Sequence, residues 1–86
     1  MKRVISRKSL QKIAAYLQKR GFRRWRSGSE EHFEKYVESG KIHVIIKPIK
    51  QGKMLLKVHL DYFPCIIMQY SPTIQDLLNK ILKLVK

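Results

Sequence analysis

The residues best suited to chemistry are three histidines, His32, His43 and His59. Near neutral pH an imidazole can accept or donate a proton, so two of them can serve as general base and general acid. Metal-free RNA cleavage uses this chemistry: one imidazole takes the 2′-hydroxyl proton, another protonates the leaving oxygen, and a lysine stabilises the phosphorane. We take the three histidines as candidate catalytic residues. The alternative is that they are exposed strand histidines without a role.

Alternating hydrophobicity predicts the strands that would position these histidines. Apolar and polar residues alternate over residues 42–47 and 54–61, as in strands with one buried face. A two-residue turn at Ser39-Gly40 would place Val37 opposite Ile42. A three-residue loop at residues 50–52, with Gly52 left-handed, would place Val44 opposite Val58.

This predicted register brings Tyr36, His43 and His59 into one row across three neighbouring strands. The row lies on the polar face of the sheet, together with Lys47 and Lys57. We expect that face to stay at least partly open.

A metal or cofactor site is not indicated by the sequence. Two histidines with Asp61 as a possible third ligand lack a recognisable spacing, and the single cysteine, Cys65, excludes a Cys-rich zinc site and an internal disulfide. The sequence has no phosphate-binding glycine loop and no nucleotide-binding fingerprint. We therefore expect no cofactor and no metal, and the cysteine usage fits a reducing, cytoplasmic setting.

The distribution of charge is the strongest indication of a partner. Lys and Arg number 19 against six acids, for a net charge of +13. Residues 1–26 contain ten of these cations and no acid. We expect them to form one outward surface for the phosphates of nucleic acid, RNA ahead of DNA. The candidate nucleic-acid-binding residues are Lys8, Lys12, Lys19, Arg20, Arg23, Arg24, Trp25 and Arg26.

Two helices are predicted, one at each end of the chain. The first covers about residues 6–20, where Leu10, Ile13, Ala14 and Leu17 form an apolar stripe opposite three of the lysines, and Gly21 ends it. The second covers about residues 72–85.

A short strand over residues 22–26 should follow the first helix. Phe22 and Trp25 then lie on opposite faces, and we expect Phe22 in the core and Trp25 at the surface. Residues 65–70 either add an edge strand or fill the core.

These elements predict one α+β domain over residues 1–86, with the order α-β(3–5)-α. An antiparallel meander sheet would carry both helices on one face. This order resembles the double-stranded-RNA-binding-domain fold, and the lysines of the first helix are similar to that domain's first contact element. The lysine-rich start of its second helix has no counterpart in residues 71–76.

A second resemblance is to the HicA family of small toxins, which share this fold and cleave mRNA. Residues 13–22 resemble the family's helix ending in Gly-aromatic, residues 26–33 resemble its Arg…Gly-Ser-His…Phe segment, and residues 74–82 resemble its last helix. Glu30 stands where the family has its catalytic histidine, and His32 follows two residues later. The resemblance implies an endoribonuclease and a protein partner such as an antitoxin.

Three functions follow as hypotheses: nucleic-acid binding, RNA cleavage of the HicA kind, and a protein-interaction or inhibitor module that covers an acidic partner. We expect no membrane association, because no apolar run approaches 18 residues and the N-terminus has no signal-peptide core.

Overall fold

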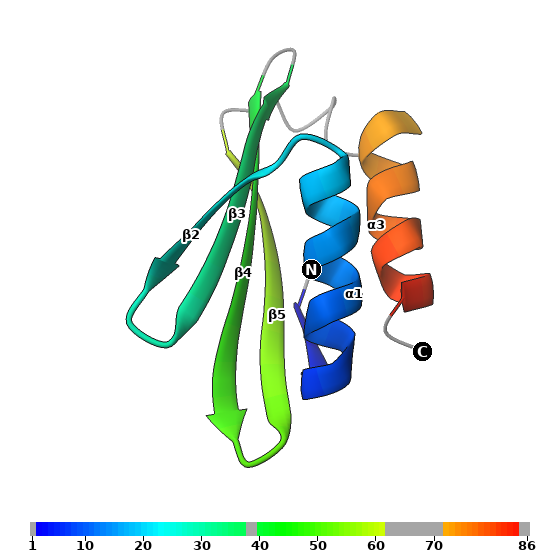
Figure 1. Ribbon diagram of the computed structural model, residues 1–86. Helices are drawn as coiled ribbons and strands as arrows, with labels where there is room; N and C mark the ends of the chain where they lie inside the picture. The colour runs from blue at the N-terminus through cyan, green and yellow to red at the C-terminus, as the bar shows by residue number, and fades with distance from the viewer. Residues whose placement is uncertain (1, 38–39, 62–71, 85–86) are drawn as a thin grey trace.

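The structure, a computed structural model, describes residues 2–37, 40–61 and 72–84. Two helices and five strands make up these residues (Figure 1). In chain order they are β1 (Lys2–Ser6), α1 (Arg7–Lys19), β2 (Arg23–Ser27), β3 (Glu30–Val37), β4 (Gly40–Lys50), β5 (Lys53–Asp61) and α3 (Pro72–Leu84).

The five strands form one sheet in the order β1-β5-β4-β3-β2, and every neighbouring pair is antiparallel. Strands β2 to β5 follow one another as the predicted meander. The strand β1 is not predicted from the sequence, and it pairs with the side of β5 that β4 leaves free. Ile5 explains its position: it lies opposite Met54 and is buried with it in the core.

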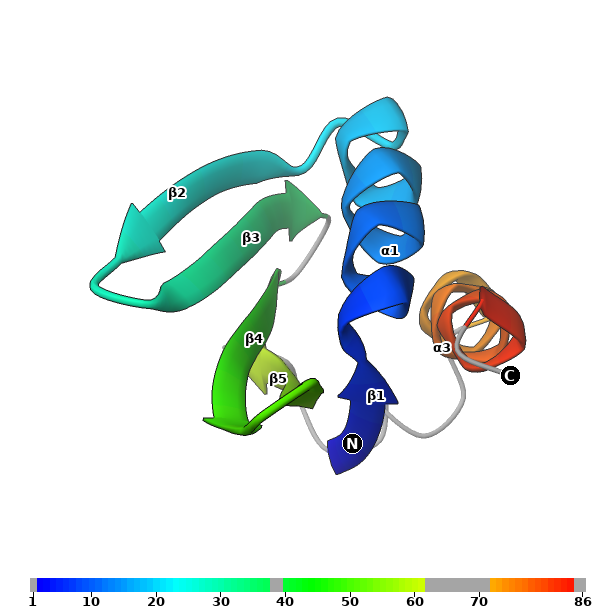
Figure 2. The same ribbon diagram turned by 60° about the horizontal axis from the view of Figure 1, so that its bottom comes forward.

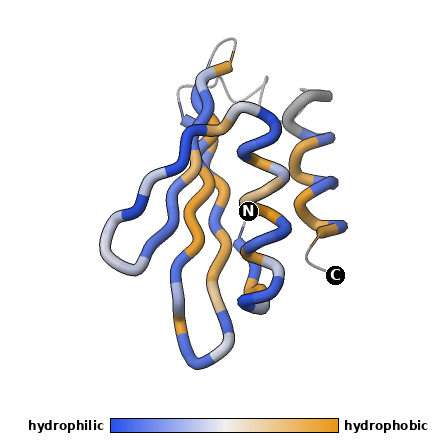
Figure 3. The backbone as a smooth tube through the Cα atoms, in the orientation of Figure 1, coloured by the Kyte–Doolittle hydropathy of each residue, from blue (hydrophilic) through white to orange (hydrophobic). Residues whose placement is uncertain are grey.

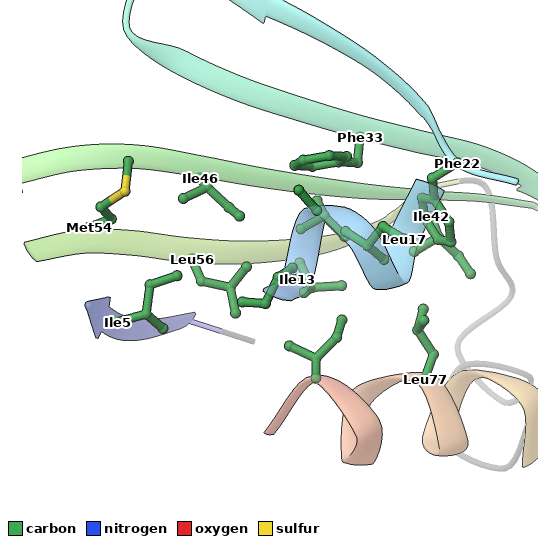
Figure 4. Close-up of a cluster of buried hydrophobic side chains, with 14 residues drawn as sticks. Ile5, Ile13, Leu17, Phe22, Phe33, Ile42, Ile46, Met54, Leu56 and Leu77 are labelled. Carbon is green, nitrogen blue, oxygen red and sulfur yellow. The ribbon is translucent and has the colours of Figure 1, made fainter. Parts of the chain in front are cut away.

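Both helices lie on the same side of the sheet, as Figures 1 and 2 show from two directions. The buried apolar residues of β3, β4 and β5 face α1, and α3 adds Leu77 and Ile81 to the same core (Figure 4). The fold class is therefore confirmed as α+β with both helices on one face. The fully buried large side chains are Phe33, Ile13, Leu17, Ile46, Leu56, Ile81 and Val44.

The end of α1 shows how the sequence directs the chain into β2. Gly21 has a φ of 87°, its N–H donates to the carbonyl of Gln18, and the N–H of Phe22 donates to the carbonyl of Leu17. This is the Schellman pattern, which places the residue after the glycine against the last turn of the helix. Phe22 is accordingly buried, as predicted, and β2 begins at the next residue.

The closing helix is confirmed over Pro72–Leu84. The segment Cys65–Tyr70, predicted as an edge strand or a core filler, lies outside the described residues. No helix in the described part of the chain is long and apolar enough to cross a membrane.

The register between β4 and β5 agrees with the prediction: Val44 lies opposite Val58, and Ile46 lies opposite Leu56. Gly52 is left-handed, with a φ of 74°. The loop itself is shorter than predicted, because the extra residue is placed in a bulge between Pro48 and Lys50.

The predicted register between β3 and β4 is wrong by two residues. Val37 lies opposite Gly40 and Phe33 lies opposite Val44, so Gly40 is the first residue of β4 and not part of a turn with Ser39. A shift of two residues keeps every side chain on the same face, so burial of the apolar residues does not distinguish the two registers.

Candidate nucleic-acid interface on the open sheet face

The side of the sheet opposite the helices carries the candidate chemical groups. Phe33 and Val44 point toward α1, so their strand neighbours His32 and His43 point the other way. Neither helix lies on this side in the described part of the chain (Figure 2). We call it the open face.

Trp25 and the three histidines come together on the open face. The rings of Trp25 and His32 stack with centroids 5.1 Å apart at 16°, and those of Trp25 and His43 lie 5.4 Å apart at 27°. The rings of His32 and His43 are 5.1 Å apart, and His59 extends the group at 6.5 Å from His43. We call these four residues the Trp–His cluster.

The two central histidines are hydrogen-bonded to each other. Nδ1 of His32 and Nε2 of His43 are 2.9 Å apart, and Nε2 of His32 is 3.2 Å from Oε1 of Glu30. One arrangement satisfies both contacts with neutral rings: Nε2–H of His32 donates to the Glu30 carboxylate, and Nε2–H of His43 donates to Nδ1 of His32. Two fully protonated imidazoles could not form the bond between the rings, so the contact requires at least one neutral histidine.

The surroundings of His43 favour its neutral form. Burial lowers the pKa of His43, and the charges of His32 and Lys41 lower it further. The charges of Asp61 and Glu34 act in the opposite direction and raise the pKa of His43 by less.

This shift predicts that the protein is less stable in mild acid. The pKa of His43 in the folded protein lies below its unfolded value of about 6.5, so the unfolded chain binds more protons in that range. The free energy of unfolding should therefore fall as the pH decreases from 7.5 to 5.5. Thermal unfolding at both pH values measures the drop.

The variant His43→Gln should show a smaller drop than the parent protein, while His59→Gln, at the exposed margin of the cluster, should retain it. Glu31 and Glu34 do not interfere, because Arg24 and Lys41 respectively hold the pKa of these carboxyls below the usual value. An unchanged drop in His43→Gln would show that His43 is not its cause.

The predicted row of Tyr36, His43 and His59 is corrected by the β3–β4 register. Glu34, not Tyr36, lies opposite His43, while Tyr36 lies opposite Lys41 and is 71% exposed. His59 does lie opposite His43, as predicted. The same two-residue shift brings His32 next to His43, which joins all three histidine candidates in one cluster.

Two arginines of β2 form ion pairs that are not predicted from the sequence. Glu31 is 5% exposed on the helix side of the sheet and accepts hydrogen bonds from Nε of Arg24 at 3.1 Å and from Nη2 of Arg26 at 2.7 Å. The hydrogen bond from Arg24 is the main reason that the pKa of Glu31 is lowered. Glu31 therefore neutralises part of the charge of both arginines.

The predicted single cationic surface in residues 1–26 is consequently wrong. The exposed lysines of α1, Lys8, Lys12 and Lys19, lie opposite its buried stripe on the helix side of the molecule. Arg24 and Arg26 also lie on that side and are bound to Glu31, whereas Arg23 and Trp25 lie on the open face. Alternation along β2 separates neighbouring residues to opposite faces.

Arg20 belongs to neither group. It caps α1, its guanidinium lies 5.3 Å from the centre of the Tyr16 ring, and its carbonyl accepts a hydrogen bond from Nζ of Lys35.

The described residues contain no group of three or more His, Cys, Asp or Glu side chains that could hold a metal ion. The direct hydrogen bond between His32 and His43 turns these two rings toward each other and not toward a shared ion.

Comparison with models of known protein families found no match to the sequence, and comparison with curated proteins found none either.

Proposed function

We propose that this protein binds single-stranded nucleic acid, RNA ahead of DNA, on the open face. The observation that carries the proposal is Trp25 stacked against His32 and His43 on a sheet face that neither described helix covers.

A flat group of aromatic rings on an uncovered sheet is suited to bases. Each base stacked on an aromatic side chain contributes about 1–3 kcal/mol, with little dependence on sequence because every base has a π face. Bases inside a duplex are already stacked on each other and cannot reach such a surface. The arrangement therefore favours single strands.

A cation borders the aromatic group. Arg23 lies two residues before Trp25 on the same face of β2, opposite Glu34. The lysines of α1 are on the other side of the molecule, so they add general attraction for polyanions and no contact with a strand that stacks on Trp25.

A binding assay at several salt concentrations tests the proposal. Fluorescence anisotropy of labelled RNA and DNA should show tighter binding of single strands than of duplex. The logarithm of the binding constant should fall linearly with the logarithm of the salt concentration, and each phosphate contact should add about 0.7 to the size of this salt slope.

Two matched variants locate the surface. Arg23→Gln on the open face should reduce the salt slope by about 0.7, and Lys12→Gln on the helix side should leave the slope for single strands unchanged. If instead Lys12→Gln reduces the salt slope, Arg23→Gln leaves it unchanged and duplex RNA binds more tightly, binding takes place on α1 and the open-face proposal is refuted. An affinity that does not change with salt would refute nucleic-acid binding as a whole.

The 2.9 Å contact between His32 and His43 favours a second candidate, metal-free RNA cleavage. A neutral imidazole would take the proton of a 2′-hydroxyl, whose oxygen then bonds to phosphorus. The bond from phosphorus to the 5′ oxygen breaks, and a protonated imidazole supplies the proton that this oxygen needs. The products are a 2′,3′-cyclic phosphate and a 5′-hydroxyl.

Incubation of RNA with the protein in the presence of a chelator separates the two candidates. A catalyst should release fragments ending in 2′,3′-cyclic phosphate, and His32→Ala should abolish the release. If the parent protein binds RNA and leaves it intact, the cleavage hypothesis is rejected and the binding hypothesis stands.

A further inference from the structure

Three lysines meet on the open face, on the side away from Trp25. Lys2 of β1 lies directly opposite Lys57 of β5. Lys57 lies opposite Ile45 of β4, and Lys47 is the next residue of β4 on the same face. Because same-face neighbours on adjacent strands lie within reach of long side chains, the three ammonium groups can converge. We call Lys2, Lys47 and Lys57 the lysine cluster.

This arrangement is unfavourable for the protein alone. Like charges directly opposite each other destabilise a sheet. Contact with Lys47, and to a smaller extent the charge of Lys2, lowers the pKa of Lys57. Glu30 is the acid that counteracts this shift.

Three other cations of the sheet are paired with acids. Lys41 is bound to Glu34, and Arg24 and Arg26 are bound to Glu31. No side-chain ion pair involves the lysine cluster within the described residues. The unpaired cluster therefore presents a concentrated positive charge that an anion would stabilise.

The amount of charge indicates which anion fits best. A phosphodiester within a strand carries one negative charge and would be matched by one lysine. A phosphate monoester carries about −1.5 to −2 at pH 7 and offers three strong acceptor oxygens. Three ammonium groups, each with three N–H donors, suit the monoester better.

We propose that the lysine cluster binds the terminal phosphate monoester of the strand whose bases stack on the Trp–His cluster. This inference rests on the proposed function. One row of the open face runs Trp25, His32, Ile45, Lys57 and Lys2 across all five strands. At about 4.8 Å per strand, Lys57 lies roughly 14 Å from Trp25. A strand lying across the sheet can therefore end at the lysines while an inner base reaches Trp25.

Three forms of one eight-nucleotide RNA test the inference: one with a 5′ phosphate, one with a 3′ phosphate, and one with hydroxyls at both ends. One phosphorylated form should bind about tenfold more tightly than the hydroxyl form, as expected from charge-assisted hydrogen bonds. Lys57→Gln should remove this preference and change the affinity of the hydroxyl form by less than about threefold. Lys53→Gln, an exposed lysine in the same strand, is the matched control and should keep the preference.

Equal affinity of all three forms would overturn the inference and leave stacking on the open face in place. If no RNA binds, the proposed function fails, and the cluster is tested directly with inorganic phosphate. NMR of the lysine ε-methylene groups should then show shifts for the lysine cluster that exceed those of Lys53. Equal shifts for all lysines would overturn the inference in that case as well.

Discussion

Replacing Phe33 by alanine should lower the free energy of unfolding by about 3–5 kcal/mol, because it deletes a large side chain from a closely packed site. Phe33 belongs to β3 and is 0% exposed, and its ring packs between the sheet and α1 (Figure 4). A chain of this length has a total stability of about 4–13 kcal/mol, so this substitution alone could unfold much of the protein.

Chemical denaturation followed by circular dichroism measures the effect of Phe33→Ala. Tyr36→Ala is the matched control, since Tyr36 is an aromatic residue of the same strand with 71% exposure, and its loss should change stability by less than about 0.5 kcal/mol. Similar stabilities for the two variants would contradict the assignment of Phe33 to the centre of the core.

Replacing Trp25 by alanine should weaken binding of single-stranded RNA by about 10- to 100-fold, which corresponds to the loss of one stacked base. The fold should be retained, because Trp25 lies on the open face and the core is on the other side. Trp25→Phe should recover part of the affinity, since a smaller aromatic ring still offers a surface for a base.

The protein contains a single tryptophan, which gives a direct measurement. RNA that stacks on Trp25 should quench its fluorescence along the same binding curve as the anisotropy. Tyr36→Ala serves as the control here too, because Tyr36 is exposed on the open face outside the Trp–His cluster. Equal RNA affinities for Trp25→Ala and the parent protein would show that Trp25 is not a stacking platform.

Side-chain alternation explains which parts of the architecture are predictable from this sequence. Burial of one face determines which alternate residues of a strand point to the core. Phe22 and Trp25 are three positions apart, so they are correctly assigned to the core and to the opposite face. Hydropathy along the backbone shows the same pattern, with hydrophobic residues in β4, β5 and α3 and a mostly hydrophilic β2–β3 hairpin (Figure 3). Burial also gives the β4–β5 register, because a shift of one residue there would turn the apolar residues of one strand to the open face.

The β3–β4 register cannot be obtained in this way. Alternation specifies a register only to within two residues, and Glu34 and Tyr36 lie on the same face of β3. With Glu34 opposite His43, as in the structure, His32 lies next to His43; with Tyr36 opposite His43, it would not. The strand β1 is also missed, because a five-residue segment with Ile5 as its one core residue has no distinct pattern of its own.

The sequence by itself determined two helices, an antiparallel meander, the face on which each strand residue lies and a large excess of positive charge, because these depend on local periodicity and composition. Only the tertiary structure decided which of those residues meet. It joined Trp25 to the three histidines, bound Arg24 and Arg26 to Glu31, and set Lys2 opposite Lys57. These contacts depend on strand pairing between distant parts of the chain, which is selected by the packing of the whole core and not by any single segment.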